Sequence, residues 1–352
     1  MKLEIQTTGV YFVSASRIAA ELGLAERVAA GLIARGGLRL SNGDASVAWF
    51  AAPDRSGLHF YGEELSTMYA SENVYWLAVG RGLLMSSVAG APSLDGPGFH
   101  LQREHLEKDA FAATLASTDP DSDFWYWSSL MASLPAYRTG TYAFQASAIE
   151  GTSGTEVTVD VNAYGATTTP HRLRLRVNGS LVGEGTFEDA VPKTLRFELD
   201  PSLLVEGANT ITVETILESG VAFDVVYIDS LDVSYPRHHV GLSDRAAFTA
   251  AGSGAVHVTG FTSDDAMVLD VTSPRTPSIV SDATQAGGTV HFEATVEHRY
   301  FAFASAAVDE PAVKAVPTLT SLRAGGTDYV VIAPESLEGA ARELAEYRES
   351  QG

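Results

Sequence analysis

The stretch Arg172-Leu-Arg-Leu-Arg-Val-Asn178-Gly179-Ser-Leu-Val182 decides the fold of the middle of the chain. Arginine and apolar residues alternate strictly as far as Val177, as they do in a strand with one buried and one exposed face. Asn178-Gly179 follows, and both residues tolerate the positive φ angles of a two-residue turn. The pattern therefore predicts a β-hairpin with its turn at Asn178-Gly179.

Short strand patterns continue on both sides of this hairpin. Between residues 140 and 237 the predicted strands are Thr141–Ala148, Thr155–Ala163, His171–Val177, Ser180–Phe187, Thr194–Leu199, Asn209–Leu217 and Phe223–Tyr235. Short strands with frequent turns are typical of a β-sandwich or jelly roll. Further strand patterns between residues 240 and 316 indicate a second, smaller β-domain.

The N-terminal part mixes helices and strands. Ser14 or Ser16 can cap a helix that runs to Gly23, and residues 25–35 form a second helical pattern. Short strand patterns follow, and residues 102–114 are compatible with a helix. We also expect strands before residue 97 to pair with strands after residue 240, with the sandwich inserted between them.

The C-terminal residues predict a strand and then a helix. Asp328-Tyr-Val-Val-Ile-Ala-Pro334 suits a strand buried on both faces. In residues 335–352, Leu337, Leu344 and Tyr347 fall at helical spacing. This order is the first half of a βαβ unit, and its returning parallel strand does not follow. We therefore expect the chain to be the front part of a larger protein.

These patterns together predict a mainly β protein. It would contain β-sandwich or jelly-roll modules, a small N-terminal α+β portion and a C-terminal βα fragment. The expected domains are an α+β domain (1–105), a jelly-roll-like β-sandwich (106–237), a small β-domain (238–325) and the first strand and helix of an α/β domain (326–352).

The composition excludes several classes of partner and chemistry. The 352 residues carry a net charge of −21, which argues against a nucleic-acid partner and against attraction to anionic membranes. The absence of cysteine excludes disulfides, thiolate metal sites and a cysteine nucleophile within these residues. No run approaches the roughly 20 apolar residues that span a bilayer. Residues 1–10 alternate as a strand does and do not form a signal peptide.

Several phrases along the chain carry a family resemblance. They are Phe60-Tyr-Gly-Glu63, Glu72-Asn-Val-Tyr-Trp-Leu77, Phe124-Trp-Tyr-Trp127, Val226-Tyr-Ile-Asp-Ser-Leu-Asp-Val-Ser-Tyr-Pro-Arg237, Leu269-Asp-Val-Thr272 and Asp328-Tyr-Val-Val-Ile332. In order and spacing they resemble the non-catalytic region that precedes the peptidase domain of gingipain-type cysteine peptidases. The sortase-like subunit of type IX secretion systems, a relative of these peptidases, shares this region.

The resemblance implies a function for the parent protein rather than for these residues. In that family a caspase-like α/β domain uses a His–Cys pair, in which the thiolate attacks the scissile carbonyl. Both residues lie beyond the first strand and helix of that domain, so no catalytic residue is assigned here. The chain would be a non-catalytic scaffold of an exported peptidase, located outside the cell or on its surface. Its expected partners are the peptidase domain in cis and a cell surface or protein substrate.

Asp119, Asp121 and Asp123 alternate as at the start of a calcium loop. An EF-hand would then need Gly and Glu where Phe124 and Leu130 stand, so a solvated loop explains the pattern more simply. We expect no required cofactor. Structural calcium stays open, because gingipain-like proteins often bind it.

A carbohydrate-binding, adhesin-like module is the rival function. Trp125 and Trp127 could stack on a sugar, although aromatic packing is the commoner fate of such residues. Asp224 and Asp229 lie in the last long strand pattern of the sandwich and could coordinate a sugar or calcium. A secretion-system subunit is a further alternative.

The histidines at 238, 239 and 298 invite a metal interpretation. Adjacent residues of an extended chain point to opposite faces, so His238 and His239 cannot chelate one ion together. We therefore prefer a structural role for them.

Overall fold

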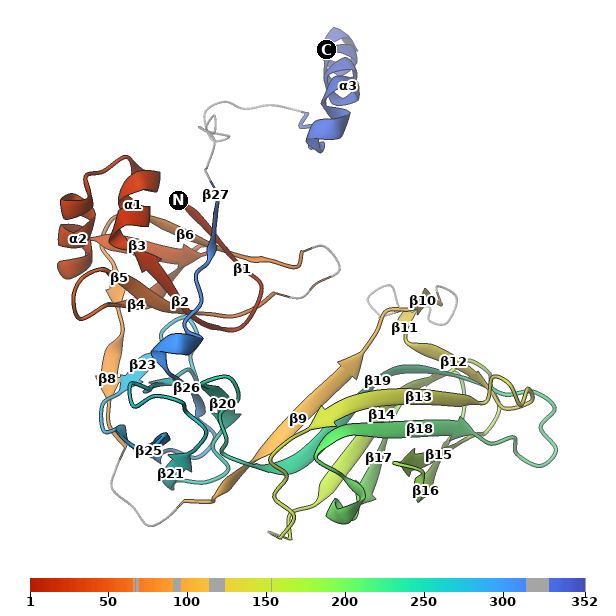
Figure 1. Ribbon diagram of the computed structural model, residues 1–352. Coiled ribbons are helices and arrows are strands. Elements are labelled where there is room, and N and C mark those ends of the chain that lie inside the picture. The colour runs from red at the N-terminus through yellow and green to blue at the C-terminus, as the bar shows by residue number, and fades with distance from the viewer. Residues whose placement is uncertain are drawn as a thin grey trace.

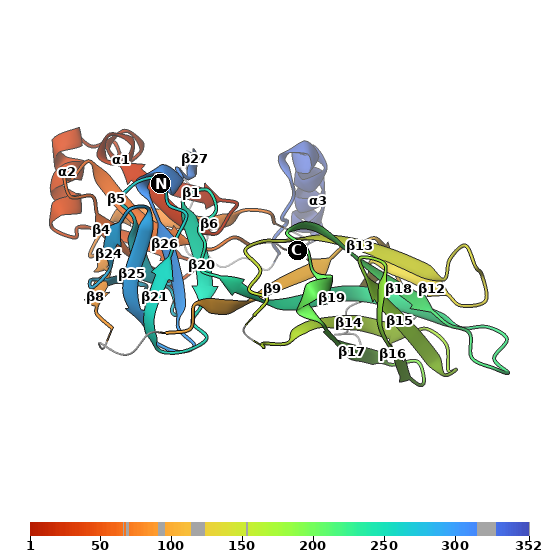
Figure 2. The same ribbon diagram turned by 60° about the horizontal axis from the view of Figure 1, so that its bottom comes forward.

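The computed structural model describes residues 1–65, 67, 70–90, 96–113, 124–152, 154–314 and 329–351. Figure 1 shows the described strands gathered into an N-terminal domain, a small β-domain beside it and a β-sandwich. The long strands β9 and β19 run from the small β-domain into the sandwich, and Figure 2 shows the same arrangement from another side. The mainly β class with a small α portion is confirmed.

The N-terminal domain is a twisted sheet with two helices packed on it. Its strands are β1 (Lys2–Ile5), β2 (Gly9–Ser14), β3 (Leu38–Asn42), β4 (Ala45–Ala51), β5 (Gly57–Gly62), β6 (Asn73–Val79), β7 (Leu83–Leu84) and β27 (Ala312–Lys314). They follow the order β2-β5-β4-β3-β6-β1-β27, with β7 beside β4. The buried Trp49 anchors the core, and its indole N–H donates to the carbonyl of Leu38 at 2.9 Å.

The predicted N-terminal helices are confirmed as α1 (Ala15–Leu22) and α2 (Glu26–Ala34). The Ser14 hydroxyl accepts a hydrogen bond from the Arg17 N–H at 3.1 Å, which caps α1. Gly23 ends α1 with a φ of 66°, a left-handed conformation that glycine adopts without strain.

The small β-domain combines late strands with one early strand. Its strands are β8 (Ser86–Val88), β20 (Arg245–Thr249), β21 (Gly254–Val258), β22 (Met267–Asp270), β23 (Ser278–Val280), β24 (Thr284–Ala286), β25 (Thr289–Ala294) and β26 (Arg299–Phe303). β8 pairs in parallel with β23, and β1 of the N-terminal domain pairs with β27. The expected pairing of early and late strands is thus confirmed, with the sandwich inserted between them.

The β-sandwich packs one antiparallel sheet on another. One sheet contains β12 (Ser128–Met131), β19 (Val225–His238), β14 (Val157–Gly165) and β17 (Pro192–Leu199), with β9 (Phe99–Glu107) also paired to β19. The other contains β13 (Thr139–Ala146), β18 (Gly207–Thr215), β15 (His171–Val177) and β16 (Ser180–Phe187). Alternate residues of both sheets, such as Val159, Leu175 and Val213, are fully buried between them.

The hairpin prediction is confirmed. β15 pairs with β16, and Val177 lies opposite Ser180. Asn178 and Gly179 have φ angles of 49° and 83°, as a turn of type I′ requires. The Asn178 amide also donates to the carbonyl of Leu203 and to the side chain of Asn209, each at 2.8 Å.

The helix-compatible prediction for residues 102–114 is wrong. Residues 99–107 form β9, which pairs with β19 from Ser230 to His238. The backbone hydrogen bonds and the packing supplied by β19 override local helical propensity, which is a weak preference. β9 also crosses the expected boundary between residues 105 and 106. The domain boundaries themselves stay a prediction.

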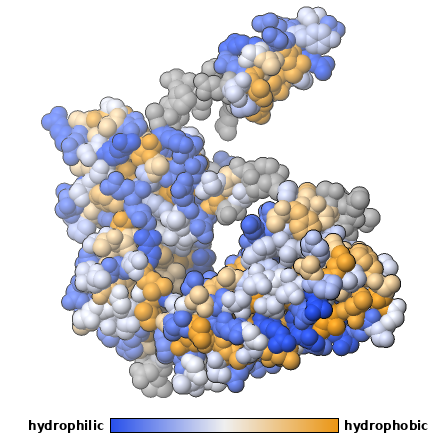
Figure 3. Space-filling view, turned by 45° about the vertical axis from the view of Figure 1, so that its right-hand side comes forward, coloured by the Kyte–Doolittle hydropathy of each residue, from blue (hydrophilic) through white to orange (hydrophobic). Residues whose placement is uncertain are grey.

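The C-terminal segment agrees in part with its prediction. The helix is present as α3 (Glu338–Gln351), after a short 3₁₀ turn, η3 (Glu335–Leu337). The strand expected at Asp328–Pro334 is not formed over residues 329–334, where Ile332 is 94% exposed. An extended apolar segment becomes a strand only when another strand supplies hydrogen-bond partners. Figure 3 shows apolar surface gathered on α3, where Leu344 and Tyr347 are exposed.

Candidate functional site

A strap, residues 309–314, joins the open edges of the N-terminal sheet. Its first part lies along β2, where the Phe12 N–H donates to the carbonyl of Asp309 at 2.8 Å. The Asp309 N–H donates in turn to the carbonyl of Val10 at 3.0 Å. Its second part is β27, which pairs antiparallel with β1. The strap therefore bends the sheet toward a closed barrel.

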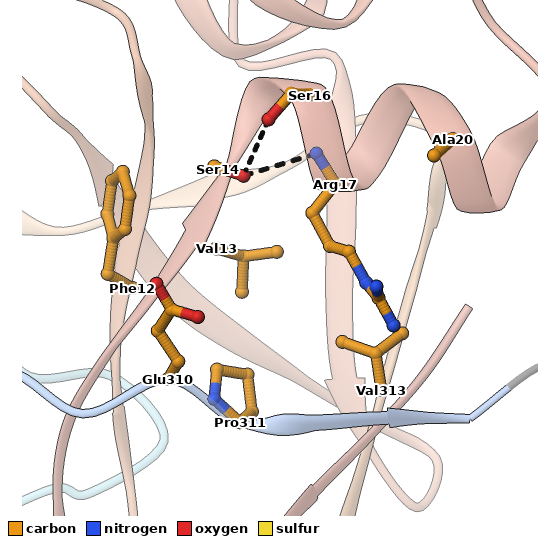
Figure 4. Close-up of a pocket in the computed structure, with 9 residues that line it drawn as sticks. All are labelled: Phe12, Val13, Ser14, Ser16, Arg17, Ala20, Glu310, Pro311 and Val313. Atoms are coloured by element: carbon orange, nitrogen blue, oxygen red, sulfur yellow. Dashed lines mark hydrogen bonds between the residues drawn. The ribbon is translucent and has the colours of Figure 1, made fainter.

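Pro311 is the residue at which the strap leaves β2. Asp309 pairs in parallel with β2, so the residue two positions later would donate the next hydrogen bond to β2. Proline has no N–H, and the ladder stops there. The strap diverges and leaves a groove of about 520 Å³ (Figure 4). Its lining residues are Phe12, Val13, Ser14, Ser16, Arg17, Ala20, Glu310, Pro311 and Val313.

This groove, the strap groove, has two serines and an arginine in its lining. The Ser14 hydroxyl caps α1 and lies 3.0 Å from the hydroxyl of Ser16, as Figure 4 shows. The Arg17 guanidinium lies 3.2 Å from the carboxylate of Glu21. The described lining contains no histidine that could take a proton from either serine. The lining thus combines hydroxyl and charged groups with apolar side chains such as Val13 and Val313.

The other side of the strap opens into a more acidic groove of about 350 Å³. Its lining includes the carboxylates of Glu4, Glu72, Asp309 and Glu310. The Lys2 and Lys314 ammonium groups lie 2.6 and 2.7 Å from the Glu4 carboxylate and hold the pKa of Glu4 below its usual range. Since Lys314 belongs to β27, this ion pair also fastens the strap to β1.

The predicted aromatic residues lie at one end of the sandwich. Trp125 belongs to the short strand β11 (Trp125–Tyr126), which pairs with β10 (Phe111–Ala112), and its ring lies 6.0 Å from that of Phe124. Trp127 packs against the core, with its ring edge-on to Tyr142 and the ring centroids 4.7 Å apart. A sugar-binding role for Trp125 and Trp127 stays a prediction.

Asp224 lies at the centre of a buried polar cluster. Its Oδ1 atom is 2.6 Å from Nδ1 of His171, and both side chains are fully buried. The hydroxyls of Thr167 and Thr215 donate to the same carboxylate. The other predicted aspartate, Asp229, is half-buried on β19 and has a ligand-binding role that stays a prediction, as does that of Asp224.

The surroundings of His171 define its charge. Its Nε2 atom lies 3.1 Å from the carbonyls of Thr167 and Asp189, which can only accept a hydrogen bond. Nδ1 faces a carboxylate, so each ring nitrogen carries a proton and the imidazole is cationic. Burial lowers the pKa of His171, but the Asp224 carboxylate outweighs burial and raises that pKa above its ordinary value. The sequence prediction missed this partner of Asp224.

The calcium hypothesis at Asp119, Asp121 and Asp123 lies outside the described residues. Within the residues that the structure describes, no group of three or more His, Cys, Asp and Glu side chains is arranged to hold a metal ion. His238 and His239 point in opposite directions as expected, because His238 is exposed and His239 is buried.

A buried pair of histidines, His100 and His239, is found where β9 and β19 meet β20. The rings of His100 and His239 are nearly parallel, with centroids 5.1 Å apart, and both pack on Phe248. In the described part of the chain, neither nitrogen of His239 has a hydrogen-bond partner. Burial lowers the pKa of His100 to about 4 and that of His239 to about 3. Nothing in the local sequence around His100 signals this burial.

Comparison of structures, but not of sequences, finds known proteins that are similar to this chain. No protein-family model matches the chain, and no curated protein matches it significantly. Among solved structures, two carbohydrate-binding modules match about a third of the chain each. A CBM36-1 domain of a multidomain xylanase from the hindgut metagenome of Trinervitermes trinervoides covers 38% of this chain and 96% of its own, at 10% identity and a TM-score of 0.25. A CBM36 in complex with calcium and xylotriose covers 30% of this chain and 99% of its own, at 14% identity and a TM-score of 0.20. Neither score is high enough to argue from.

A particular structure matches nearly the whole chain. It is dimeric latent PorU from Porphyromonas gingivalis, with a TM-score of 0.67 over 88% of this chain. The sequence identity is 14%, so the match shows a shared fold. The present chain covers 32% of the length of that protein, about a third.

Proposed function

We propose that this chain is a β-rich, non-catalytic region of a PorU-like protein related to the gingipain-type cysteine peptidases. The observation that carries the proposal is the fold match to PorU over 88% of the chain. Because the match extends over 88% of the chain, it includes parts of the N-terminal domain, the sandwich and the small β-domain rather than one module alone.

The sequence resemblance adds support from separate residues. Five of its six phrases overlap β5, β6, β11, β19 and β22, which span the N-terminal domain, the sandwich and the small β-domain. The parent would be either a gingipain-like endopeptidase or a sortase-like secretion subunit. In both cases its location would be outside the cell or on its surface. Among the described residues, no helix combines the length and apolar character needed to cross a bilayer.

The chain would act as a scaffold for an α/β domain. β9 and β19 form a continuous ribbon that couples the sandwich to the small β-domain, and the strap leads from the N-terminal sheet toward residues 329–351. That segment exposes Ile332, Leu344 and Tyr347, which a following α/β domain would cover.

The proposal is tested on the parent reading frame. The codons after Gly352 should encode further strands and helices with a His and a Cys, and the protein expressed from them should cleave peptides. Replacing that Cys with Ala should abolish cleavage. Deletion of the sandwich should impair folding or activity even though the Cys is retained. A stop codon directly after Gly352 refutes the proposal.

Binding of carbohydrate is tested on the same chain. Glycan-array binding that needs calcium and is lost in Trp125→Ala would favour the adhesin-like alternative. Asp224→Asn is unsuitable for this purpose, because its carboxylate neutralises the buried imidazole of His171.

A further inference from the structure

Two histidines on neighbouring strands of the small β-domain lie directly opposite each other. His257 is in β21 and His291 is in β25, and the antiparallel register pairs one with the other. Val256 and Phe292, one position away along the strands, are buried. Side chains alternate between the faces of a sheet, so both imidazoles stand on its outer face. His257 is exposed, and His291 is half-buried.

The two imidazole rings approach each other through their Nδ1 atoms. Nδ1 of His257 contacts Nδ1 of His291, with the rings inclined at 73° and their centroids 4.6 Å apart. Without a metal, this contact requires one nitrogen to carry a proton and the other to offer its lone pair. Each neutral imidazole has a lone pair that could instead be directed at one shared cation.

We propose that His257 and His291 together bind a divalent transition-metal ion through their Nδ1 atoms. Imidazole is a preferred ligand of copper, nickel and zinc, whereas calcium and magnesium prefer oxygen. Opposed residues of an antiparallel pair have Cβ atoms about 4.5–5.5 Å apart, so both rings reach an ion at roughly 2.0–2.1 Å after small rotations. Because His257 is exposed, the ion would reach the pair directly from solvent.

The remaining positions on the ion are filled by water, because the described residues supply no third protein ligand there. Two imidazoles alone impose no fixed coordination geometry, so the choice of metal ion depends on the intrinsic affinity of imidazole for each ion. Binding should therefore follow the general order for divalent metals, with Cu²⁺ above Ni²⁺ and Zn²⁺. The bound ion would link β21 to β25 and stabilise that edge of the small β-domain, since a ligand of the folded state favours folding.

The test uses the whole chain without an affinity tag. Calorimetric titration with CuCl₂, NiCl₂ and ZnCl₂ at neutral pH should give one site, tightest for Cu²⁺. His257→Gln and His291→Gln should each weaken Cu²⁺ binding at least tenfold. His59→Gln is the matched control, because His59 is a half-buried strand histidine of β5 in the N-terminal domain, and this variant should bind Cu²⁺ as the wild type does.

Copper spectroscopy gives an independent readout. The electron paramagnetic resonance spectrum of the 1:1 complex should show coupling to two imidazole nitrogens, and to one in either single variant. The proposal is overturned if the wild type fails to bind Cu²⁺ at 100-fold excess over protein, or if the His257→Gln and His291→Gln variants bind it unchanged. The inference stands apart from the proposed function, so neither result bears on the PorU-like assignment.

Discussion

The buried pair His100 and His239 should make the protein sensitive to mild acid. In the unfolded chain a histidine has a pKa near 6.5, whereas in the folded protein burial lowers the pKa of His100 to about 4 and that of His239 to about 3. A pKa lowered by folding means that the unfolded state binds more protons between the two values. Stability is therefore full above pH 6.5 and is lost as the pH falls.

The size of the effect follows from these values. At pH 5 each histidine is about 1.5 pH units below its unfolded pKa, and each unit is worth about 1.36 kcal/mol. Each buried imidazole should thus cost about 2 kcal/mol between pH 8 and pH 5. After burial, the neighbouring His100 contributes most to lowering the pKa of His239, and the buried cationic Arg237 lowers the pKa of both histidines further.

The perturbation is His239→Leu, which replaces the imidazole with an apolar side chain of similar size that can still pack against Phe248. Urea unfolding at pH 8 and at pH 5 should show that the variant loses about 2 kcal/mol less than the wild type on acidification. Carboxylates and the other histidines titrate in both proteins and cancel in this difference. His238→Leu changes an exposed neighbour and should retain the wild-type pH dependence. An equal loss in wild type and His239→Leu would refute the reasoning.

Other predictions follow from single contacts. Asp224→Asn leaves the cationic His171 without its counter-ion, so the free energy of unfolding should fall by about 3–5 kcal/mol, whereas Asp229→Asn should cost far less. Because the pKa of His171 is raised, the stabilisation by Asp224 is full below pH 6.5 and is lost as the pH rises through that raised value, so the deficit of Asp224→Asn should shrink at alkaline pH. Gly179→Ala meets open space but a φ of 83°, and should cost about 1–2 kcal/mol by backbone strain, whereas Gly183→Ala in β16, where φ is not positive, tests the effect of a methyl group alone. Ser14→Ala removes the cap of α1 and should cost about 1 kcal/mol, and a Ser14→Asp variant should restore it; an unchanged melting temperature in Ser14→Ala would contradict the capping role.

The candidate site shows what sequence reasoning could not reach. The strap groove exists only because residue 309 pairs with β2 and residue 311 lacks an N–H, and the local sequence does not show that pairing. Likewise Asp224 is visible in the strand pattern, while its partner His171 is far from it in the chain and is brought close by the packing of one sheet on the other. The pair His257 and His291 was findable in part, since each histidine stands between apolar residues in an alternating pattern. The sequence did not show that β21 and β25 are neighbours or in which register they pair.

Local chemistry by itself determined the elements whose signals are short-ranged. The Asn178-Gly179 turn, the cap at Ser14 and the glycine end of α1 depend on the φ angles and hydrogen bonds of a few adjacent residues, and each is found where predicted. Tertiary structure decided the rest. Residues 99–107 form a strand because β19 supplies backbone hydrogen-bond partners to them. Residues 329–334 do not form a strand, because no described strand lies beside them. A strand is completed by hydrogen bonds to another segment, so its existence depends on contacts that local sequence does not contain.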